Sequence, residues 1–261
     1  MNYKNLVEQL QINRGERIWL SSEIIKFVLL FKKEGIKFDG SALLKEFQKA
    51  VGEEGLIMLP VFSFEFSNKG VYDAVKTKGS TGALGNIALE MNGFKRTKHP
   101  MHSFAVWGKD AEELISLQNK NSFGVDSPFG YCLKKNVRQI ILGTDYVHAM
   151  TFIHYAEYVC NVPYRFAKSF TGKYITEDGR EEQRTYEYAA RKLEIEPTEI
   201  FNQMGSVLEE KGISRRITIR GIDCYDINLA ASFPIICDDI LRNQCGNIYS
   251  FNIDRKKIFN D

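Results

Sequence analysis

Three polar side chains recur at intervals of three residues in the segment Thr151-Phe152-Ile153-His154-Tyr155-Ala156-Glu157. If this segment is helical, Thr151, His154 and Glu157 lie along one stripe, because each residue advances about 100° around the axis. Glu157 can then hold one ring nitrogen of His154, and the other nitrogen is left to accept a proton. The spacing favours a histidine base supported by a carboxylate, although a surface Glu–His pair would have the same spacing.

Other chemistries fit the sequence less well. The His-x-x-Glu spacing occurs in carboxylate-bridged di-iron bundles, but those sites need a second copy of the motif, and the sequence contains none. We therefore expect no metal. Cys160 follows His154 on the same predicted helix, and a buried free cysteine is its simpler interpretation. The absence of G-x-S-x-G, G-x-x-x-x-G-K-[ST] and a clear G-x-G-x-x-G argues against serine hydrolases, nucleoside-triphosphate enzymes and dinucleotide enzymes.

The composition is that of an ordinary globular protein. Of the 261 residues, 44% are hydrophobic and 26% charged, and no run of about 18 apolar residues indicates a membrane helix. The N-terminus lacks the apolar core of a signal peptide. Five cysteines, an odd number without C-x-x-C spacing, favour a reducing cytosol. We therefore expect a cytoplasmic protein without membrane or nucleic-acid partners, since a net charge of +2 is too small to indicate nucleic acid.

The elements that must position His154 are read from apolar periodicity and turn residues. Predicted strands cover residues 17–22, 56–62, 104–107, 137–143 and 216–222. Predicted helices cover residues 3–12, 42–51 with Ser41 as N-cap, 81–91, 111–119, 147–160, a segment starting at 197–198, and 228–240, which Pro234 interrupts. A hairpin is expected around Asp178-Gly179, residues 63–79 read as a long loop, and residues 24–33 fit a strand end or a buried helix. Without repeats or linkers, residues 1–261 are expected to form one α/β domain.

The stretch from Ile57 to Arg165 resembles the aminoglycoside 3-N-acetyltransferase family, whose antibiotic acetyltransferase fold differs from the GNAT type. Matching blocks occur in the family's order. They are Leu59-Pro60-Val61-Phe62-Ser63, Gly82-Ala83-Leu84-Gly85, Arg96-Thr97-Lys98-His99-Pro100-Met101-His102-Ser103, Gly124-Val125-Asp126-Ser127-Pro128-Phe129-Gly130, and Leu142-Gly143 with the segment Thr151–Glu157. The resemblance implies an α/β fold with a central mixed, largely antiparallel sheet flanked by helices.

The resemblance also implies functional roles. It makes acetyl-CoA or another acyl-CoA the cosubstrate, His154 the base and Glu157 its support. It places Ser21, Ser22, Ser63, His99 and Ser103 along the coenzyme A cleft. Thr151 or backbone amides are candidate donors to the oxyanion of the tetrahedral intermediate. Many members have His-Ser-Ser after the first strand, whereas this chain has Leu20-Ser21-Ser22, which leaves only the contacts of that histidine in question.

The acceptor is predicted from charge. Residues 63–79 carry Lys69, Lys76 and Lys78 against Glu65 and Asp73, and residues 99–109 contain no acid. A basic acceptor side suits an anionic nucleotide-linked amino sugar better than a polycationic aminoglycoside, although these lysines could equally be a solvated surface. An aminoglycoside-resistance acetyltransferase and a catalytically silent binding protein remain alternatives. The partners are then small molecules, with a second copy of the chain as a further candidate, while the sugar, the acyl length and the oligomeric state are not readable from the sequence.

Overall fold

The strongest apolar runs of the sequence become neighbouring strands at the centre of one sheet. The structure, a computed structural model, describes residues 2–192, 194–195 and 197–259. In it, β1 (Arg17–Ser22) lies between β6 (Arg138–Leu142) and β2 (Leu56–Pro60) and is parallel to both. The sheet has the order β10-β11-β6-β1-β2-β5-β4. Its outer strands, all paired antiparallel, are β5 (Phe104–Gly108), β4 (Lys95–Arg96), β10 (Ser214–Ile219) and β11 (Ile222–Asn228). The prediction of a mixed, largely antiparallel sheet is confirmed.

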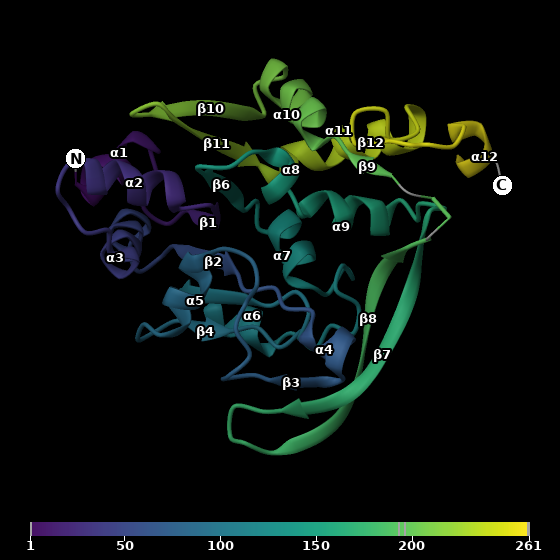
Figure 1. Ribbon diagram of the computed structural model, residues 1–261, viewed down its shortest axis with the longest axis horizontal. Helices are drawn as coiled ribbons and strands as arrows, with labels where there is room; N and C mark the ends of the chain where they lie inside the picture. The colour runs from purple at the N-terminus through teal and green to yellow at the C-terminus, as the bar shows by residue number, and fades with distance from the viewer. Residues whose placement is uncertain (1, 193, 196, 260–261) are drawn as a thin grey trace.

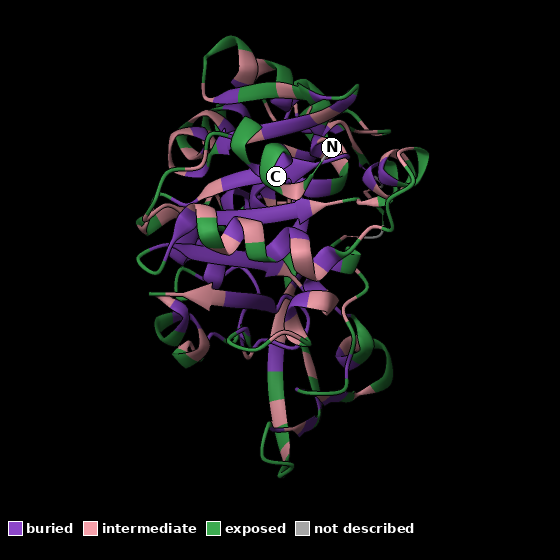
Figure 2. Ribbon diagram, turned by 90° about the vertical axis from the view of Figure 1, so that its left-hand side faces the viewer, coloured by how far each residue is buried: buried purple, intermediate pink, exposed green. Residues whose placement is uncertain are grey.

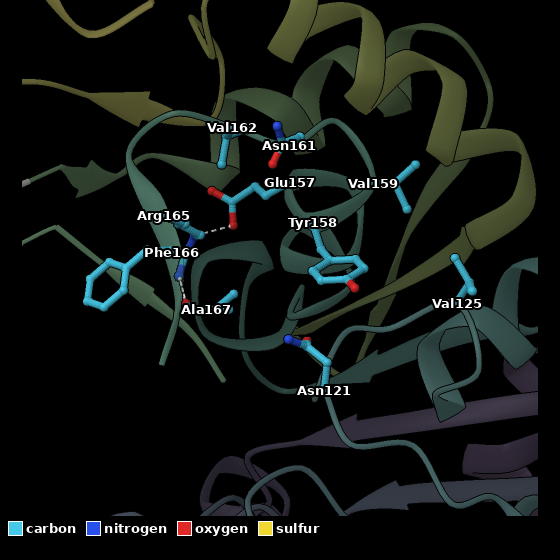
Figure 3. A pocket seen from close by; sticks show the side chains of 11 residues that line it. Asn121, Val125, Glu157, Tyr158, Val159, Asn161, Val162, Arg165, Phe166 and Ala167 are labelled. Atoms are coloured by element: carbon cyan, nitrogen blue, oxygen red, sulfur yellow. Dashed lines mark hydrogen bonds and ion pairs between the residues drawn. The ribbon is translucent and has the colours of Figure 1, made fainter. Parts of the chain in front are cut away.

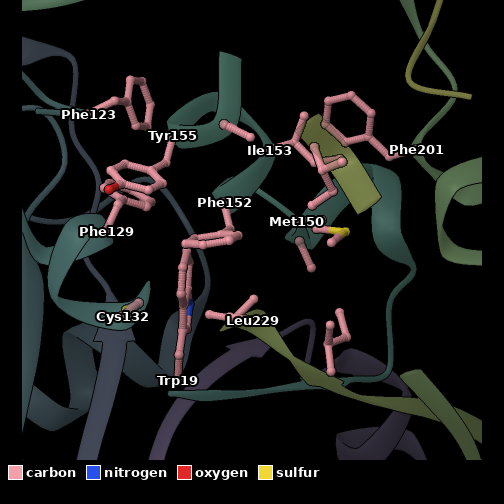
Figure 4. Close-up of a cluster of buried hydrophobic side chains, with 14 of the residues drawn as sticks. Trp19, Phe123, Phe129, Cys132, Met150, Phe152, Ile153, Tyr155, Phe201 and Leu229 are labelled. Carbon is pink, nitrogen blue, oxygen red and sulfur yellow. The ribbon is translucent and has the colours of Figure 1, made fainter. Parts of the chain in front are cut away.

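Alternate residues of the central strands enter two separate cores, because successive side chains of a strand point to opposite faces. Ile18 and Leu20 belong to one core, whereas Trp19 belongs to the other. The first core also takes side chains from α1 (Tyr3–Gln9), α2 (Ile25–Lys33), α3 (Gly40–Val51) and α5 (Ala83–Leu89). The second takes side chains from α6 (Ala111–Ser116), α7 (Pro128–Lys134), α9 (Phe152–Val159), α10 (Phe201–Glu210) and α11 (Leu229–Arg242). Figure 4 shows Trp19, Phe129 and Phe152 in this second core, and Figure 2 shows the buried strands between the helices.

A long hairpin, β7 (Arg165–Ile175) and β8 (Glu181–Arg191), leaves the body beside α9 and projects from it (Figures 1 and 2). Gly179 adopts a φ of 82° in its turn, as the Asp-Gly signal predicted. The tip pairs in parallel with β3 (Val71–Asp73), which follows α4 (Glu65–Lys69). The prediction of an irregular loop over residues 63–79 is therefore wrong. The partner that orders β3 lies about one hundred residues away in the chain, and local pattern cannot reveal it.

Other boundaries differ from the sequence predictions for local reasons. The expected helix over residues 147–160 is two helices, α8 (Tyr146–Ala149) and α9, separated by Met150 with ψ of 52°. The strand expected over residues 216–222 is part of the hairpin β10–β11, whose turn holds Arg220 and Gly221 at positive φ. Asp39, not Ser41, caps α3.

Three further segments differ in structure from, or decide between, the sequence predictions. Residues 24–33 form α2, which resolves the choice left open. Pro234 does not interrupt α11, which runs through it. The segment after Pro197 first forms β9 (Thr198–Glu199), paired with β12 (Tyr249–Ser250), before α10 begins, and α12 (Arg255–Phe259) follows β12. Among the described residues, none of the helices combines the length and apolarity that crossing a bilayer requires.

Candidate active site

His154 and Glu157 face each other on α9. Nδ1 of His154 lies 2.6 Å from Oε2 of Glu157. The His154 side chain is 15% exposed and that of Glu157 fully buried, so this is not the surface pair that the spacing also allowed. Thr151 is the N-cap residue of α9, with helical backbone angles, three positions before His154. His154 and Glu157 are thus in contact, and Thr151 lies at the N-terminal end of α9.

Two residues that follow α9 also contact the Glu157 carboxylate. Tyr164 donates its hydroxyl to Oε1 at 2.7 Å, and Nε of Arg165 lies 2.8 Å from Oε2. The Nε–H has no aligned hydrogen-bond acceptor among the described residues, so the Arg165 contact is an ion pair. Arg165 is fixed in turn, because it donates to the Ala189 carbonyl and to the hydroxyl of Tyr249. Figure 3 shows Glu157 and Arg165 side by side. Both line a pocket of about 410 Å³ between α9 and β7.

These contacts decide the charges of the pair. Burial opposes ionisation of Glu157, but the charges of Arg165 and His154 outweigh it and lower the pKa of this carboxyl to about 2. Burial and the nearby Arg165 charge lower the pKa of His154 below its ordinary value, with Glu157 opposing them. His154 is therefore neutral at neutral pH. Its Nδ1–H is donated to Glu157, and Nε2 carries a lone pair that no described residue occupies with a hydrogen bond.

Aromatic rings enclose the imidazole of His154. The rings of Phe123 and Phe201 lie 5.6 Å and 5.9 Å from it, both edge-on. Phe123 comes from the loop before α7 and Phe201 from the start of α10, so distant parts of the chain exclude water from this side chain. An enclosed neutral imidazole with one free nitrogen can take a proton from a bound substrate.

A cleft of about 610 Å³ lies beyond the carboxyl ends of the parallel strands β1 and β2. Open α/β sheets bind ligands at this edge. Its lining includes Ser21, Ser22 and Thr151, three of the residues that the sequence singled out. The Ser21 hydroxyl accepts a hydrogen bond from Gln139 at 3.0 Å. Thr151 lies about one helical turn before His154, which does not itself line this cleft.

Three residues predicted to border the cleft lie elsewhere and act on the chain itself. His99 is 1% exposed, and its Nδ1 accepts the backbone N–H groups of Met101 and His102. Ser103 is fully buried and donates to the Val61 carbonyl at 2.9 Å. Ser63 is 2% exposed and accepts the N–H of Glu65 at the start of α4. None of the three lines this cleft, and each makes hydrogen bonds within the chain, so their contact with coenzyme A stays a prediction.

Other residues in the site escaped the sequence analysis. Thr81, Gly82, Thr144 and His148 line the cleft, and His148 pairs with Asp145 at 2.6 Å. Tyr164 and Arg165, which hold Glu157, gave no signal, because their contacts arise only when β7 folds back beside α9. Cys160 is partly exposed and has a raised pKa, which suits no nucleophile. Within the described part of the chain, no group of three or more His, Cys, Asp and Glu residues is arranged to hold a metal ion.

Comparison with known proteins gives a consistent result. The sequence profile of the family described as aminoglycoside 3-N-acetyltransferase matches residues 34–236. The chain is 26% identical over 231 residues to the SPbeta prophage-derived aminoglycoside N(3')-acetyltransferase-like protein YokD of Bacillus subtilis (strain 168), covering 79% of this chain and 81% of that protein.

Solved structures share the fold. The crystal structure of YokD superposes with a TM-score of 0.74 at 19% identity and covers 92% of this chain and 98% of its own. AAC-IIIb in binary complex with CoASH has a TM-score of 0.74 at 15% identity, covering 92% of this chain and 95% of that chain. AAC-VIa bound to sisomicin, in a room-temperature neutron and X-ray structure, has a TM-score of 0.75 at 17% identity, with 92% and 97% covered.

Proposed function

This chain belongs to the aminoglycoside 3-N-acetyltransferase family, whose reaction is coenzyme A-dependent N-acetylation, and on that premise we propose that it acylates the amine of an amino sugar with His154 as general base. Acyl-CoA is the cosubstrate. We propose that this amino sugar is linked to a nucleotide. Residues from Ser21 in β1 to Tyr249 in β12 contribute to the cleft or to the contacts around Glu157, which supports one domain that works as a unit.

The observation that carries the proposal is the environment of His154. A sugar amine is largely protonated near neutral pH and attacks only after it loses a proton. The neutral His154, oriented through Nδ1 by the ionised Glu157, presents Nε2 as the acceptor of a proton from the attacking amine. The buried Arg165 keeps Glu157 ionised, and its charge helps to lower the pKa of His154 so that the imidazole stays neutral.

The proposed reaction needs no covalent enzyme intermediate. The amine releases its ammonium proton to solvent before it attacks. The nitrogen of the free amine then attacks the thioester carbonyl carbon while His154 Nε2 takes one of its two N–H protons, and the carbonyl π pair moves onto oxygen. When the carbonyl reforms, the C–S bond breaks with its electron pair on sulfur, and the proton held by His154 passes to the departing thiolate. The products are an amide and the free thiol of coenzyme A. Holding both substrates together supplies much of the acceleration.

Two of the three lysines in residues 63–79 form ion pairs within that segment. Lys69 pairs with Glu65 at 3.2 Å and Lys76 with Asp73 at 3.9 Å, so these two lysines are neutralised locally. They support the solvated-surface interpretation rather than an anion site.

The acidic residues near His154 give better support. The two carboxylates whose charges act on His154 are Glu157 and Glu199. Glu157 is held by Arg165, and Glu199 pairs with Arg191 at 2.9 Å. A polycationic aminoglycoside needs free carboxylates to receive its ammonium groups, and both of these are already engaged with arginines. An acceptor that does not depend on ammonium–carboxylate contacts, such as a nucleotide-linked amino sugar, suits this environment better.

The test is a panel of acceptors assayed for release of coenzyme A thiol from acetyl-CoA. We expect release with at least one nucleotide-linked amino sugar and little with gentamicin-type drugs. Release with the drugs and with none of the nucleotide sugars would overturn the acceptor assignment while leaving the reaction class intact.

A second candidate is an aminoglycoside-resistance acetyltransferase, favoured by the names of the relatives and by the sisomicin bound to AAC-VIa. It predicts that expression raises the inhibitory concentration of such a drug in a susceptible host. The third candidate, a silent binding protein, predicts that His154→Ala changes no turnover and no phenotype.

A further inference from the structure

A second histidine, His102, contacts one aromatic ring that lines the cleft and another that packs on His154. Its ring centre is 4.8 Å from that of Phe62 and 4.8 Å from that of Phe123. Phe62 lines the cleft, and Phe123 contacts His154. A thioester that extends from the cleft toward His154 to meet the acceptor amine would pass beside this second imidazole.

His102 is enclosed and uncharged. Only 4% of the residue is exposed, and the ring of Tyr188 stacks on it at 5.6 Å with an interplanar angle of 16°. Burial, with the charges of His99, His154 and Arg165, holds its pKa well below the ordinary value. A histidine that stays neutral serves as a hydrogen-bond donor or acceptor without changing the charge of the site.

A chain of hydrogen bonds assigns the tautomer. His99 accepts two backbone N–H groups at Nδ1, so its proton is on Nε2, which lies 3.3 Å from the Lys120 carbonyl and 3.4 Å from the hydroxyl of Ser122. That hydroxyl lies 2.9 Å from Nδ1 of His102 and 3.3 Å from the carbonyl of Glu187. A hydroxyl has one proton to donate. Donation along the shorter contact, to the imidazole nitrogen, places the proton of His102 on Nε2, whereas donation to the Glu187 carbonyl would place it on Nδ1. The Nε2–H has no hydrogen-bond partner among the described residues.

We infer that the Nε2–H of His102 donates to the carbonyl oxygen of the acyl thioester and to the oxyanion formed when the amine attacks. The inference rests on the proposed acyl transfer. His102 keeps its proton throughout, since the amine proton travels through His154 to the thiolate. A preorganised donor in an enclosed aromatic site stabilises developing charge more than water does, and loss of one such donor lowers kcat on the order of 10²-fold.

Two substitutions separate donation from packing. His102→Phe keeps a ring in the aromatic cluster but removes the N–H, whereas His102→Gln places an amide N–H near the former Nε2. We expect kcat to fall about 10²-fold in the Phe variant and to recover in part in the Gln variant, with KM for acyl-CoA little changed. An unchanged kcat in folded H102F would overturn the inference. So would loss of the acid limb of the pH–rate profile, because that result makes His102 a base.

Ser122 provides a second arm, because its hydroxyl sets the tautomer. Ser122→Ala frees His102 to place its proton on Nδ1, so kcat falls, whereas Ser122→Thr keeps the hydroxyl and the activity. An equal kcat in both variants counts against the assigned tautomer.

A measurement without an acceptor keeps this inference apart from the proposed function. Acetyl-CoA labelled with ¹³C at the carbonyl is bound to the intact protein, and its resonance is recorded by NMR. Hydrogen bonding by His102 moves the resonance downfield in the native protein and in H102Q, and the shift is lost in H102F. The same resonance in native protein and H102F overturns the inference. Failure of every acceptor to release thiol overturns only the proposed function.

Discussion

One carboxylate oxygen of Glu157 serves both His154 and Arg165. Oε2 lies 2.6 Å from Nδ1 of His154 and 2.8 Å from Nε of Arg165. The carboxylate orients the base through the first contact, and the cation keeps the carboxylate ionised through the second. Because Arg165 Nη2 also lies 3.2 Å from Nδ1 of His154, the same cation disfavours the protonated imidazole. The orientation and the protonation state of the base are thereby coupled in one buried cluster.

Removing the base should abolish most of the activity without unfolding the protein. His154→Gln keeps a polar side chain of similar volume but cannot accept the amine proton. We expect kcat to fall 10²- to 10⁴-fold, about the usual contribution of general base catalysis, with little change in Tm. Steady-state thiol release and thermal unfolding measure the two effects. Arg242→Gln, at a side chain 83% exposed on α11, is the control that should change neither. A kcat for H154Q within threefold of the native value would remove His154 from the mechanism.

Neutralising the carboxylate should cost both activity and stability. Glu157→Gln leaves Arg165 as a buried charge without its counterion, which typically destabilises a protein by about 3–5 kcal/mol. Urea unfolding at pH 7 measures the loss. The matched control is Glu199→Gln, which breaks the more exposed pair with Arg191 and should cost about 1 kcal/mol or less. Equal losses in the two variants would show that burial does not set the strength of the Glu157 pair.

The pH dependence of turnover should report the lowered pKa of His154. The free imidazole is the active form, so kcat/KM should rise with pH through a limb below the ordinary value of about 6.5. Arg165→Gln removes the charge that opposes protonation, while the attraction of Glu157 remains, and should move this limb to higher pH. Initial rates measured from about pH 4.5 to about pH 9, a range that spans the ordinary pKa of histidine, test this shift. A limb that stays in place in R165Q contradicts the coupling.

Stability should fall with acidity before the carboxylates titrate. Burial lowers the pKa of His99 to about 4 and also lowers those of His102 and His154. Between pH 6.5 and 4 the unfolded chain therefore binds protons that the folded protein does not, and the free energy of unfolding decreases as pH falls through this window. His99 alone accounts for roughly 2 kcal/mol between pH 7 and pH 5. Urea titrations at both values measure the change. His99→Gln should flatten the dependence, and an unaltered slope in H99Q would contradict the assignment.

A side chain at Gly82 should obstruct the cleft. Gly82 has a φ of 67°, and an added Cβ would lie 3.1 Å from the backbone oxygen of Ser22. Gly82→Val should weaken acyl-CoA binding by about 1–3 kcal/mol, a tenfold or greater rise in its KM, without changing the KM of the acceptor. Gly179→Val is the matched control, because Gly179 has a φ of 82° and open space around it. If both variants raise KM alike, backbone strain rather than cleft volume is the cause.

The sequence by itself determined the features whose signal is local. Apolar runs located β1, β2, β5 and β6, because buried central strands read as continuous hydrophobic segments. The Asp178-Gly179 turn located the β7–β8 hairpin. The spacing of His154 and Glu157 brought the two side chains together, since three residues make nearly one helical turn. An ordered set of motifs gave the family, which the profile match establishes.

Only the tertiary structure decided which groups act on those residues. Tyr164 and Arg165 follow α9 by a few positions, yet they reach Glu157 because the chain reverses into β7, and Tyr249 fixes Arg165 from the far end of the sequence. His99 carries the family motif but is buried and bonded to its own backbone. The physical reason is that pKa, accessibility and ion pairing depend on burial and on neighbours remote in sequence. A one-dimensional pattern records the side chains and their local spacing, and the packing of β7, β8 and α10 around α9 supplies the rest.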